Sequence, residues 1–420
     1  MSKIYDETNR EELMDEAKKC LKCKVPKCRK ACPIETDIPS VMNLFLEGNE
    51  KEAGELLFGN NPLSAICSVV CPHENNCYGN CVLGIKKDPI AFYKIEQYLS
   101  GKYVSESEIV RPQKNGMKIA VIGAGPAGIS MSIFMAVKGF QVTLMESQEK
   151  IGGVLRYGIP EFRLPKSRVD AYRKVLKQLG VTLKPNCHIG SNLLMEDMFI
   201  DGYDAVFLSV GTAKPNRLGL LGETLGHAHF AIDFLKSPDA YDLGETVAVI
   251  GAGNVAMDVA RTALRQKGVK KVLVLNNRRE EDVTATKLEY TETLEEGAEF
   301  IHLMSVLRIS EKSLLAVDVD VTQGENGIIY EENMLSRHNI DADTVILAIG
   351  QGPESTLSDK AQIATTLRGL FVVDENGMTN IPGVFAAGDV VSGPKTVVEA
   401  VAHTKRVSEQ MIKYCYDKRK

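Results

Sequence analysis

The chain has 420 residues, 44% of them hydrophobic and 25% charged, which is enough for two or three domains with their own cores. Its 50 Lys and Arg residues nearly balance 55 Asp and Glu residues, and no basic tract stands out, which argues against nucleic acid as a partner. No apolar run approaches the roughly 18 residues of a membrane span, and the charged N-terminus lacks the apolar core of a signal peptide. We therefore expect a cytoplasmic protein.

Residues 1–110 combine helical patterning with cysteines. The stretches EELMDEAKKCLKC and IPSVMNLFLEGNEKEAGELL carry apolar residues at helical spacing, which predicts a mostly helical domain. Eight of the ten cysteines lie in this segment, whereas Cys187 and Cys415 are isolated and are interpreted as unpaired thiols. In a reducing compartment such a concentration indicates metal binding rather than disulfides.

The cysteine spacing distinguishes between two kinds of metal site. The first group is C-x2-C-x4-C-x3-C-P and the second is C-x3-C-P-x5-C-x3-C; the members are Cys20, Cys23, Cys28, Cys32, Cys67, Cys71, Cys77 and Cys81. A C-x2-C run with a later Cys-Pro is typical of two-cluster ferredoxins, in which the last cysteine serves the other cluster. Structural zinc, the alternative, usually draws two CxxC pairs or adds histidines, but only one CxxC and one nearby histidine, His73, are present. The spacing therefore favours two iron-sulfur clusters with crossed ligation.

From Arg111-Pro112 onward, apolar strand runs alternate with helical stretches, which predicts an α/β fold with a parallel sheet. The runs are MKIAVIGAG, FQVTLME, YDAVFLSVG, TVAVIGAG, KKVLVLNN, DTVILAIG and GVFAAGD. Two of them end in glycine turns, VIGAGPAG and VIGAGNVA, so we expect two Rossmann-like dinucleotide-binding domains. Strand patterning returns after Asp341 without a third glycine turn, so the second domain is expected to be inserted in the first. The expected domains are residues 1–110, 111–229, 230–347 and 348–420, the second and fourth forming one domain.

The first glycine turn follows a strand and opens a helix. Its small residues permit a tight turn and a close approach of the backbone to a pyrophosphate, which the helix N-terminus attracts. The turn comprises Gly123, Gly125, Pro126, Ala127 and Gly128. Glu146 ends the next strand, where a carboxylate would accept hydrogen bonds from a ribose and repel a 2′-phosphate.

The second glycine turn differs at the end of the next strand. The turn comprises Gly251, Gly253, Asn254, Val255 and Ala256, with alanine in the third glycine position. The following strand ends in Asn276-Asn277-Arg278-Arg279, so two guanidinium groups replace the carboxylate, and NADPH is favoured over NADH. The acidic residues Glu280, Glu281 and Asp282 follow at once, so a solvated turn of mixed charge is the alternative.

With these motifs the whole chain resembles the glutamate synthase small-subunit family. This family includes the NAD(P)-binding subunit of bacterial dihydropyrimidine dehydrogenase and related ferredoxin-NADP transhydrogenase large subunits. The resemblance implies that one 4Fe-4S cluster is bound by Cys20, Cys23, Cys28 and Cys81, and the other by Cys32, Cys71, Cys77 and Glu96. Gln97 stands next to Glu96, Cys67 would not be a ligand, and an exposed helix carboxylate is the alternative interpretation of Glu96.

The resemblance also implies FAD at the first glycine turn. Residues expected to contribute are Val70, Gly152, Gly153, Arg163, Gly388, Asp389, Thr396 and Val397, while Ala348, Ile349 and Gly350 are expected between the two nucleotides. The helix after Thr396 departs from the family at Thr404, Val407 and Ser408, where small residues are usual, so its local packing is an open question.

These features predict an electron-input subunit. Hydride transfer from NADPH, or NADH, to FAD requires no protein nucleophile, so no catalytic residue is expected, and isolated histidines such as His227, His229 and His403 are interpreted as ordinary polar residues. Because the expected domains leave no room for a substrate domain, electrons must leave the chain. The resemblance implies delivery to an FMN-containing dihydropyrimidine dehydrogenase-type subunit, to a glutamate synthase large subunit or to ferredoxin, in a hetero-oligomer. The alternative is a non-catalytic redox or nucleotide sensor that binds the same cofactors.

Overall fold

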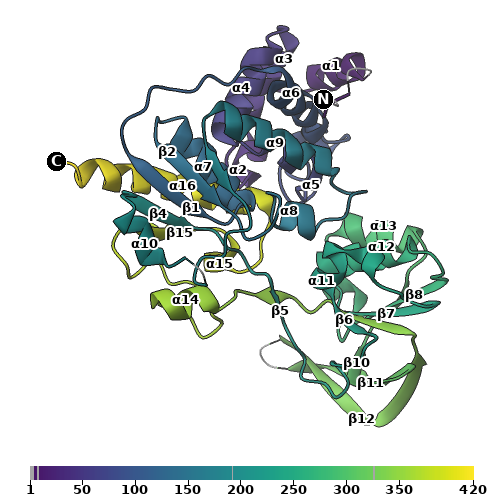
Figure 1. The fold of residues 1–420 in the computed structure, drawn as a ribbon. Coiled ribbons are helices and arrows are strands. Elements are labelled where there is room, and N and C mark those ends of the chain that lie inside the picture. Colours follow the sequence, from purple (N-terminus) through teal and green to yellow (C-terminus); the bar gives the residue numbers. More distant parts are fainter. Residues whose placement is uncertain (1–3, 7–8, 192, 325–326) are drawn as a thin grey trace. The chain divides into compact units, whose positions relative to one another are not determined.

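The computed structural model describes residues 4–6, 9–191, 193–324 and 327–420, which form two compact units (Figure 1). Unit 1 comprises Met1–Arg156, Glu161–Thr212 and Gly352–Lys420, and unit 2 comprises Tyr157–Pro160 and Ala213–Gln351. Unit 2 is thus inserted in unit 1, as the strand patterning predicted. No helix among the described residues is both long enough and apolar enough to span a membrane.

The N-terminal part of unit 1 is helical, as predicted from the apolar spacing. Its helices are α1 (Arg10–Lys18), α2 (Lys27–Ala31), α3 (Ile38–Leu46), α4 (Glu50–Asn60), α5 (Ser64–Val70) and α6 (Phe92–Glu106), with a 3-10 turn η1 (Val82–Ile85). Their apolar faces share one core that contains Val41, Phe45, Leu57, Ile95 and Leu99, all nearly inaccessible. The cysteines lie mainly at helix ends and in the loops, where the backbone is free to bring them together.

The rest of unit 1 is built on a parallel five-stranded sheet in the order β15-β4-β1-β2-β3. The strands are β1 (Lys118–Ile122), β2 (Gln141–Met145), β3 (Thr182–Lys184), β4 (Ala205–Leu208) and β15 (Val384–Ala386). Because β15 comes from the C-terminal segment and pairs with β4, the chain must return to this sheet after unit 2. The pairing explains physically why the second domain is an insertion.

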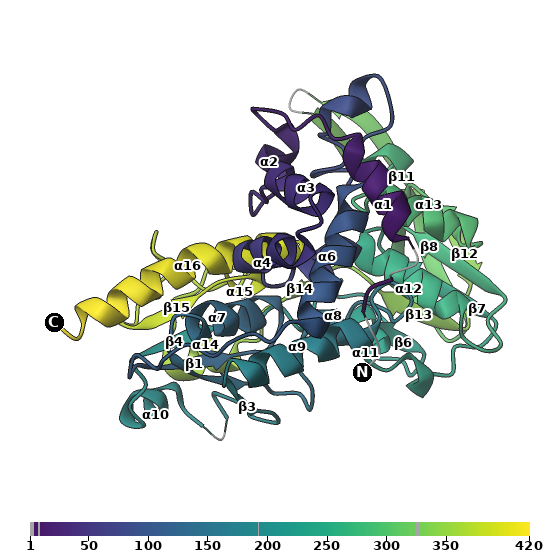
Figure 2. The same cartoon turned by 90° about the horizontal axis from the view of Figure 1, so that it is seen from above.

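Helices complete this Rossmann-like layer. They are α7 (Pro126–Ala136), α8 (Val154–Tyr157), α9 (Lys166–Gln178), α10 (Met195–Ile200), α14 (Thr356–Ala361), α15 (Asp389–Ser392) and α16 (Val397–Asp417). The long helix α16 runs alongside α7 (Figure 2). Helix α7 is buried over nearly its whole length, because it packs against β1 and β2 as well as against α16.

Unit 2 contains a second parallel sheet, in the order β6-β13-β7-β8-β9. Its strands are β6 (Ala228–Phe230), β7 (Thr246–Ile250), β8 (Lys271–Leu275), β9 (Glu299–Ile301) and β13 (Thr344–Leu347), and its helical segments are α11 (Ala231–Lys236), η2 (Pro238–Ala240), α12 (Asn254–Leu264), η3 (Glu280–Asp282) and α13 (Lys287–Glu295). The unit starts at Ala213, before the expected bound at residue 230, because Leu221 forms a bridge with Arg308 and β6 pairs with β13 of this sheet. Short strands β5 (Lys214–Pro215) and β14 (Gln351–Gly352) pair where the chain enters and leaves the unit.

An antiparallel sheet in unit 2 was not predicted from the sequence. It consists of β10 (Met304–Ser310), β11 (Ser313–Gly324) and β12 (Gly327–Asp341) in that order. Its buried residues Val306, Ile309 and Leu314 share a core with Ile250 and Leu275 of the parallel sheet. The antiparallel sheet therefore covers one face of the parallel sheet, opposite the apolar core that includes residues of α11 and α12.

Candidate cofactor sites

The first cysteine group lies in one neighbourhood although its members come from both halves of the motif. Burial raises the pKa of Cys28 to about 11, and the nearby thiols of Cys81, Cys20 and Cys23 add to the rise. The pKa of Cys20 is raised by burial and then by Cys23 and Cys81. The fold thus brings Cys81, the last cysteine of the second run, beside the first three of the first run.

The second group gathers around Glu96 on α6. Burial raises the pKa of Cys71 to about 12, and Glu96 and Cys32 raise it further. Burial also raises the pKa of Cys77, and the nearby Glu96, Cys71 and Cys32 raise the pKa of Cys77 further. Glu96 is only 7% exposed and burial raises its pKa to about 8, so it is not an exposed helix carboxylate. The Asn76 side chain donates to Cys71 Sγ at 3.1 Å, a contact that the cysteine spacing did not reveal.

The chemistry of this donor set fits a cationic iron-sulfur core. Burial raises the pKa values of Cys71, Cys77 and Glu96, because water no longer solvates their charged forms. A cationic centre among them would favour the thiolates and the carboxylate, which are the ligand forms that metals bind. Among the described residues, no three His, Cys, Asp or Glu side chains are arranged to hold a single metal ion. Cys67 is fully buried in α5, and burial raises its pKa well above the usual range.

The first glycine turn connects β1 to α7 and has no room for a side chain at Gly123 or Gly128. Gly123 has a φ of +95°, and a Cβ there would lie 2.5 Å from the carbonyl oxygen of Ser209. A Cβ on Gly128 would lie 1.8 Å from the Gly123 carbonyl oxygen. The Ser209 hydroxyl donates to that same carbonyl at 2.9 Å, a supporting contact that the sequence did not indicate. Gly125 and Pro126, at the N-terminus of α7, remain partly exposed, where the pyrophosphate site is expected.

Neighbouring loops converge on this turn. Gly152 has a φ of +131° and donates its N–H to the Ala124 carbonyl at 2.8 Å. A Cβ on Gly153 would lie 2.8 Å from the Gly125 Cα, so two glycine backbones nearly touch. Arg163, in the loop between α8 and α9, and Val70, at the end of α5, are both partly buried residues of unit 1.

Glu146 directly follows β2 and lies beside the first glycine turn. One carboxylate oxygen accepts from the Ala124 N–H at 2.7 Å, and the other accepts from the Gln148 N–H at 2.8 Å. The residue is 7% exposed. The carboxylate that the sequence predicts to bind a ribose is therefore hydrogen-bonded directly to the glycine turn.

The C-terminal segment supplies a second set of polar groups to unit 1. Asp389 follows β15, and burial raises its pKa to about 6. Gly388 packs closely on the first turn, because a Cβ there would lie 3.0 Å from the Ala127 Cβ. Thr396 caps α16 through a reciprocal capping box with Glu399, which satisfies two of the helix's terminal N–H groups and fixes its N-terminus.

The residues of α16 that depart from the family pattern are accommodated locally. Thr404 is buried and its hydroxyl donates to the Ala400 carbonyl at 2.8 Å, and the Ser408 hydroxyl donates to the Lys405 carbonyl at 2.7 Å. Val407 packs against Gly377, where a Cβ would lie 2.4 Å from its side chain. The helix therefore stays regular through these positions, since each hydroxyl is satisfied by its own helix.

The second glycine turn has the same construction in unit 2. Gly251 has a φ of +120°, and a Cβ there would lie 2.4 Å from the Ala348 carbonyl oxygen. Asn254 Oδ1 accepts from the Thr286 N–H at 2.8 Å, so the loop before α13 closes over the start of α12. Ala256 is fully buried, as expected for the position that packs the helix on the sheet. Ala348, Ile349 and Gly350 follow β13 at the same edge of the sheet, next to the turn.

The two arginines after β8 have different surroundings. Arg279 pairs with Asp282 at 2.7 Å and with Glu281 at 3.0 Å. Arg278 is exposed, and its guanidinium carbon lies 4.3 Å from the centre of the Tyr330 ring. Asn276 replaces the carboxylate of the first site; it accepts from the Arg278 N–H and donates to His302 Nδ1, each at 2.9 Å. Among the described residues, the acidic residues of the turn thus form ion pairs with Arg279 and not with Arg278.

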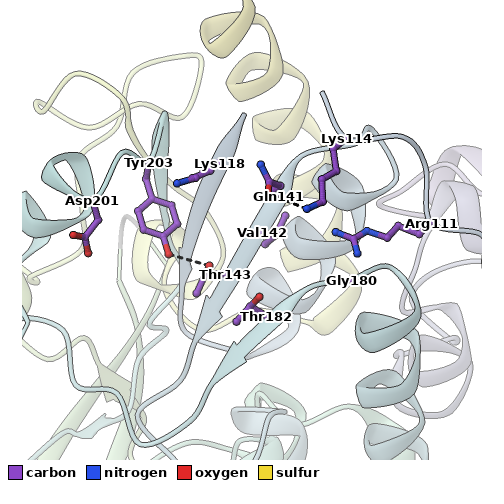
Figure 3. Close-up of a pocket in the computed structure, with 10 residues that line it drawn as sticks. All are labelled: Arg111, Lys114, Lys118, Gln141, Val142, Thr143, Gly180, Thr182, Asp201 and Tyr203. Carbon is purple, nitrogen blue, oxygen red and sulfur yellow. Dashed lines mark hydrogen bonds between the residues drawn. The ribbon is translucent and has the colours of Figure 1, made fainter. Parts of the chain in front are cut away.

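A separate pocket of about 310 Å³ lies at the amino ends of strands β1, β2 and β3 of unit 1, away from the first glycine turn (Figure 3). Its lining residues are Arg111, Lys114, Lys118, Gln141, Val142, Thr143, Gly180, Thr182, Asp201 and Tyr203. The Tyr203 hydroxyl donates to Thr143 Oγ1 at 2.9 Å, and Lys114 Nζ donates to Gln141 Oε1 at 3.3 Å. It contains none of the predicted site residues, because the glycine turns lie at the carboxyl ends of the strands.

Two glycine turns on two parallel sheets, joined to a helical cysteine domain, define an oxidoreductase of the two-dinucleotide type. The family model described as pyridine nucleotide-disulphide oxidoreductase matches residues 117–404. The model described as dihydropyrimidine dehydrogenase domain II, 4Fe-4S cluster, matches residues 1–108.

Named relatives extend over nearly the whole chain. The glutamate synthase [NADPH] small chain of Escherichia coli (strain K12) is 30% identical over 441 residues, which cover 98% of this chain and 93% of that one. The NAD-dependent dihydropyrimidine dehydrogenase subunit PreT homolog of Salmonella typhi is 32% identical over 406 residues, which cover 95% of this chain and 93% of that one. The chain therefore belongs to the pyridine nucleotide-disulphide oxidoreductase family, in the group that contains glutamate synthase small chains and PreT dihydropyrimidine dehydrogenase subunits.

A solved structure agrees on the fold. FprA of Mycobacterium tuberculosis in complex with NADPH is similar with a TM-score of 0.63 at 18% identity, over 72% of this chain and 85% of that one. At this identity the likeness concerns the fold alone. The family and the fold together confirm the predicted oxidoreductase class, with a cluster domain preceding the FAD and NAD(P) folds.

Proposed function

We propose that the chain is the electron-input subunit of a larger oxidoreductase. It takes a hydride from NADPH, or from NADH, and passes electrons through two 4Fe-4S clusters to a separate partner. FAD supplies the chemistry that converts a two-electron hydride into single electrons, and the clusters carry those electrons one at a time. The observation that carries the proposal is the division of the cysteines into two groups, one of which surrounds the buried Glu96.

The cysteine groups assign ligands to each cluster. Cys20, Cys23, Cys28 and Cys81 would hold one cluster, since Cys23 and Cys81 lie near enough to raise the pKa values of both Cys20 and Cys28. The other set comprises Cys32, Cys71, Cys77 and Glu96. Gln97 is a weaker candidate than Glu96, because Glu96 is the buried residue that influences Cys71 and Cys77.

The residues of unit 1 hold FAD by charge and backbone. The free N–H groups at the start of α7 would bind the pyrophosphate, and Glu146 would accept hydrogen bonds from the ribose. Asp389 would bind the ribityl chain, and the capped N-terminus of α16 would stabilise negative charge on the flavin ring.

The structure also supports an order for the two clusters. Helix α5, which ends directly before Cys71, contacts α16, and Glu399 in the first turn of α16 contributes to the raised pKa of Cys71. The Cys71 group would then lie nearer to the helix assigned to the flavin and would receive electrons first. The Cys20 group would then be the exit towards the partner.

The partner supplies the substrate site. The two described relatives are named a small chain and a subunit, and we propose an analogous partner here: an FMN-containing dihydropyrimidine dehydrogenase-type subunit, a glutamate synthase large subunit, or ferredoxin. A cytoplasmic location suits the proposal, because a reducing compartment keeps the cysteine ligands available as thiolates. Co-purification from the native host identifies the partner.

Turnover by the purified holoprotein tests the proposal. We expect a brown, flavin-containing protein that reduces an artificial acceptor with NADPH, and more slowly with NADH. Loaded protein with no turnover on either nucleotide would indicate a sensor rather than an enzyme. Colourless protein that contains zinc would contradict both functions.

Glu96 allows a sharper test of the ligand assignment. Glu96→Ala should lose about half of the bound iron, because one of two clusters loses a ligand, whereas Glu96→Gln keeps an oxygen ligand and should retain more of it. Iron analysis and electron paramagnetic resonance of the reduced protein measure the change. Gln97→Ala is the matched control on the same helix and should leave both clusters intact. Unchanged iron content and potentials in Glu96→Ala would show that the assignment is wrong.

A further inference from the structure

Tyr330 links strand β12 to the two arginines that follow β8. Its ring centre lies 4.3 Å from the Arg278 guanidinium carbon, within the range of a cation–π contact. Its hydroxyl donates to Asp282, which in turn accepts from Arg279 Nε at 2.7 Å. One side chain from the antiparallel sheet therefore touches both halves of the Arg278-to-Asp282 turn. All of these residues belong to unit 2.

The charges of this turn are unequally distributed. Arg279 has two acidic partners, Asp282 and Glu281, so its positive charge is largely matched. Among the residues that the structure describes, no carboxylate lies within ion-pair distance of Arg278, whose contact is with a neutral ring. Arg278 is also exposed, so its guanidinium can reach a ligand. Of the two arginines, Arg278 is thus the one whose guanidinium has no ion-pair partner among the described residues.

We propose that Tyr330 is a positioning residue for nucleotide selection: it holds Arg278 flat so that Arg278, and not Arg279, binds the 2′-phosphate of NADPH. This inference rests on the proposed function and goes beyond it, because it separates the two arginines and adds a residue from a distant strand. Stacking restricts the guanidinium plane before the ligand arrives, which lowers the entropy lost on binding. Arg279 has a different task, because it neutralises the carboxylates of the turn that would otherwise repel a phosphate.

Binding of nucleotide fragments to the holoprotein tests the proposal independently of turnover. The probes are adenosine 2′,5′-bisphosphate, which carries the 2′-phosphate, and 5′-AMP, which lacks it, both measured by calorimetry. Tyr330→Leu removes the ring and should weaken the binding of adenosine 2′,5′-bisphosphate about two- to fivefold, the range of an exposed cation–π contact. The affinity for 5′-AMP should not change. Tyr330→Phe keeps the ring and should retain most of the discrimination. Ile329→Ala is the matched control, because adjacent strand residues point to opposite faces, and it should change neither affinity.

The arginines supply the second arm. Arg278→Ala should weaken the binding of adenosine 2′,5′-bisphosphate about tenfold or more, as expected for the loss of a charged hydrogen-bond partner. The double substitution Arg279→Gln with Asp282→Asn removes one charge of each sign and should have little effect. Steady-state KM values for NADPH and NADH should move in the same way, with the NADPH value rising selectively.

Specific outcomes would overturn the proposal. Equal weakening of both probes in Tyr330→Leu would mean that the ring only supports the hairpin, and no weakening would mean that it does not position Arg278. A larger loss in the Arg279 and Asp282 double variant than in Arg278→Ala would reverse the two roles. Holoprotein that discriminates between the probes but oxidises neither nucleotide would support this inference and contradict the proposed enzymatic function, so the two failures are distinguishable.

Discussion

The two glycine turns have nearly the same backbone but different surroundings. Gly123 and Gly251 both have positive φ angles, and a Cβ on either would lie about as close to a carbonyl oxygen of a neighbouring segment, at 2.5 Å and 2.4 Å. At the end of the following strand, Glu146 bonds to its own turn in unit 1, whereas Asn276 bonds to the Arg278 N–H and to His302 in unit 2. On the proposed function, the turn would provide a general pyrophosphate site, and the end of the next strand would distinguish the nucleotides.

The helices that follow the two turns also differ. Helix α7 has no charged residue and is buried by α16 and the sheet. Helix α12 carries Arg261, which is 7% exposed and pairs with Glu289, Glu292 and Glu296. Unit 1 covers its turn helix with apolar contacts, and unit 2 attaches α12 to α13 by an ion-pair network.

The largest expected effect tests whether the turns are independent. Gly123→Ala should yield protein without FAD, and Gly251→Ala should yield flavin-containing protein that no longer binds the nicotinamide nucleotide. In each case a Cβ meets backbone that cannot move easily, and we expect a loss of about 2–4 kcal/mol in stability. Flavin absorbance and nucleotide titration measure the two outcomes.

A matched glycine separates the clash from the positive φ. Gly202 has a φ of +80°, and no atom lies within 4 Å of the place that a Cβ would occupy, so Gly202→Ala should cost about 1 kcal/mol and retain both cofactors. Loss of FAD from Gly251→Ala would contradict the assignment of one nucleotide to each turn.

Removal of Arg261 should have the next largest effect. Arg261→Ala leaves Glu289 buried at 8% exposure without this cation, and we expect a loss of about 3 kcal/mol in the free energy of unfolding of unit 2. Arg265→Ala is the control from the same helix end: its side chain is 42% exposed, so its loss should cost less than about 1 kcal/mol. Equal destabilisation by the two changes, measured by chemical denaturation, would argue against the buried network.

A substitution directly after β8 should give the second nucleotide site the preference for an unphosphorylated ribose that is expected of the first site. Asn276→Asp places a carboxylate where Glu146 stands in the first site, so it should favour the ribose hydroxyls of NADH and repel the 2′-phosphate of NADPH. We expect the ratio of the two kcat/KM values to shift towards NADH by about tenfold. An unchanged ratio would show that Arg278 and its neighbours decide the selectivity alone.

The smallest expected effect is a pH dependence confined to unit 2. Hydrogen bonds from Arg265 and Arg261 lower the pKa of Glu296 to about 2, below its ordinary value of 4.5. Its stabilising contribution is therefore complete above about pH 4.5 and is lost as the pH falls towards 2. Because the group is partly exposed, we expect less than about 1 kcal/mol. Between pH 5 and pH 3 the midpoint temperature of thermal unfolding should fall less steeply in Glu296→Gln than in the unchanged protein. Equal slopes in the two proteins would contradict the stabilising role of the Glu296 charge.

Local patterns in the sequence were sufficient for much of this protein. All seven predicted strand runs form strands, and both glycine turns sit between a strand and a helix, because these features depend on residues close in sequence. The cysteine spacing predicted the kind of metal ligand, and the resemblance implied that Cys81 belongs with Cys20. The structure brings these two thiols together.

Contacts between distant residues could not be predicted in this way. The sequence pattern does not indicate the antiparallel sheet β10-β11-β12, nor Tyr330, which lies on a strand far along the chain from Arg278. It does not indicate Ser209 at the first turn or Thr286 at the second for the same reason.

The sequence by itself determined the class of protein, the insertion of one dinucleotide domain in another, and the residue types that surround each site. Tertiary structure decided that Glu96 is buried, that Arg279 forms ion pairs within its own turn, and that the Arg278 guanidinium lies over the Tyr330 ring. The physical reason is that burial, ion pairing and stacking depend on which groups meet when separate elements pack. Local sequence patterns alone do not specify these contacts between distant residues.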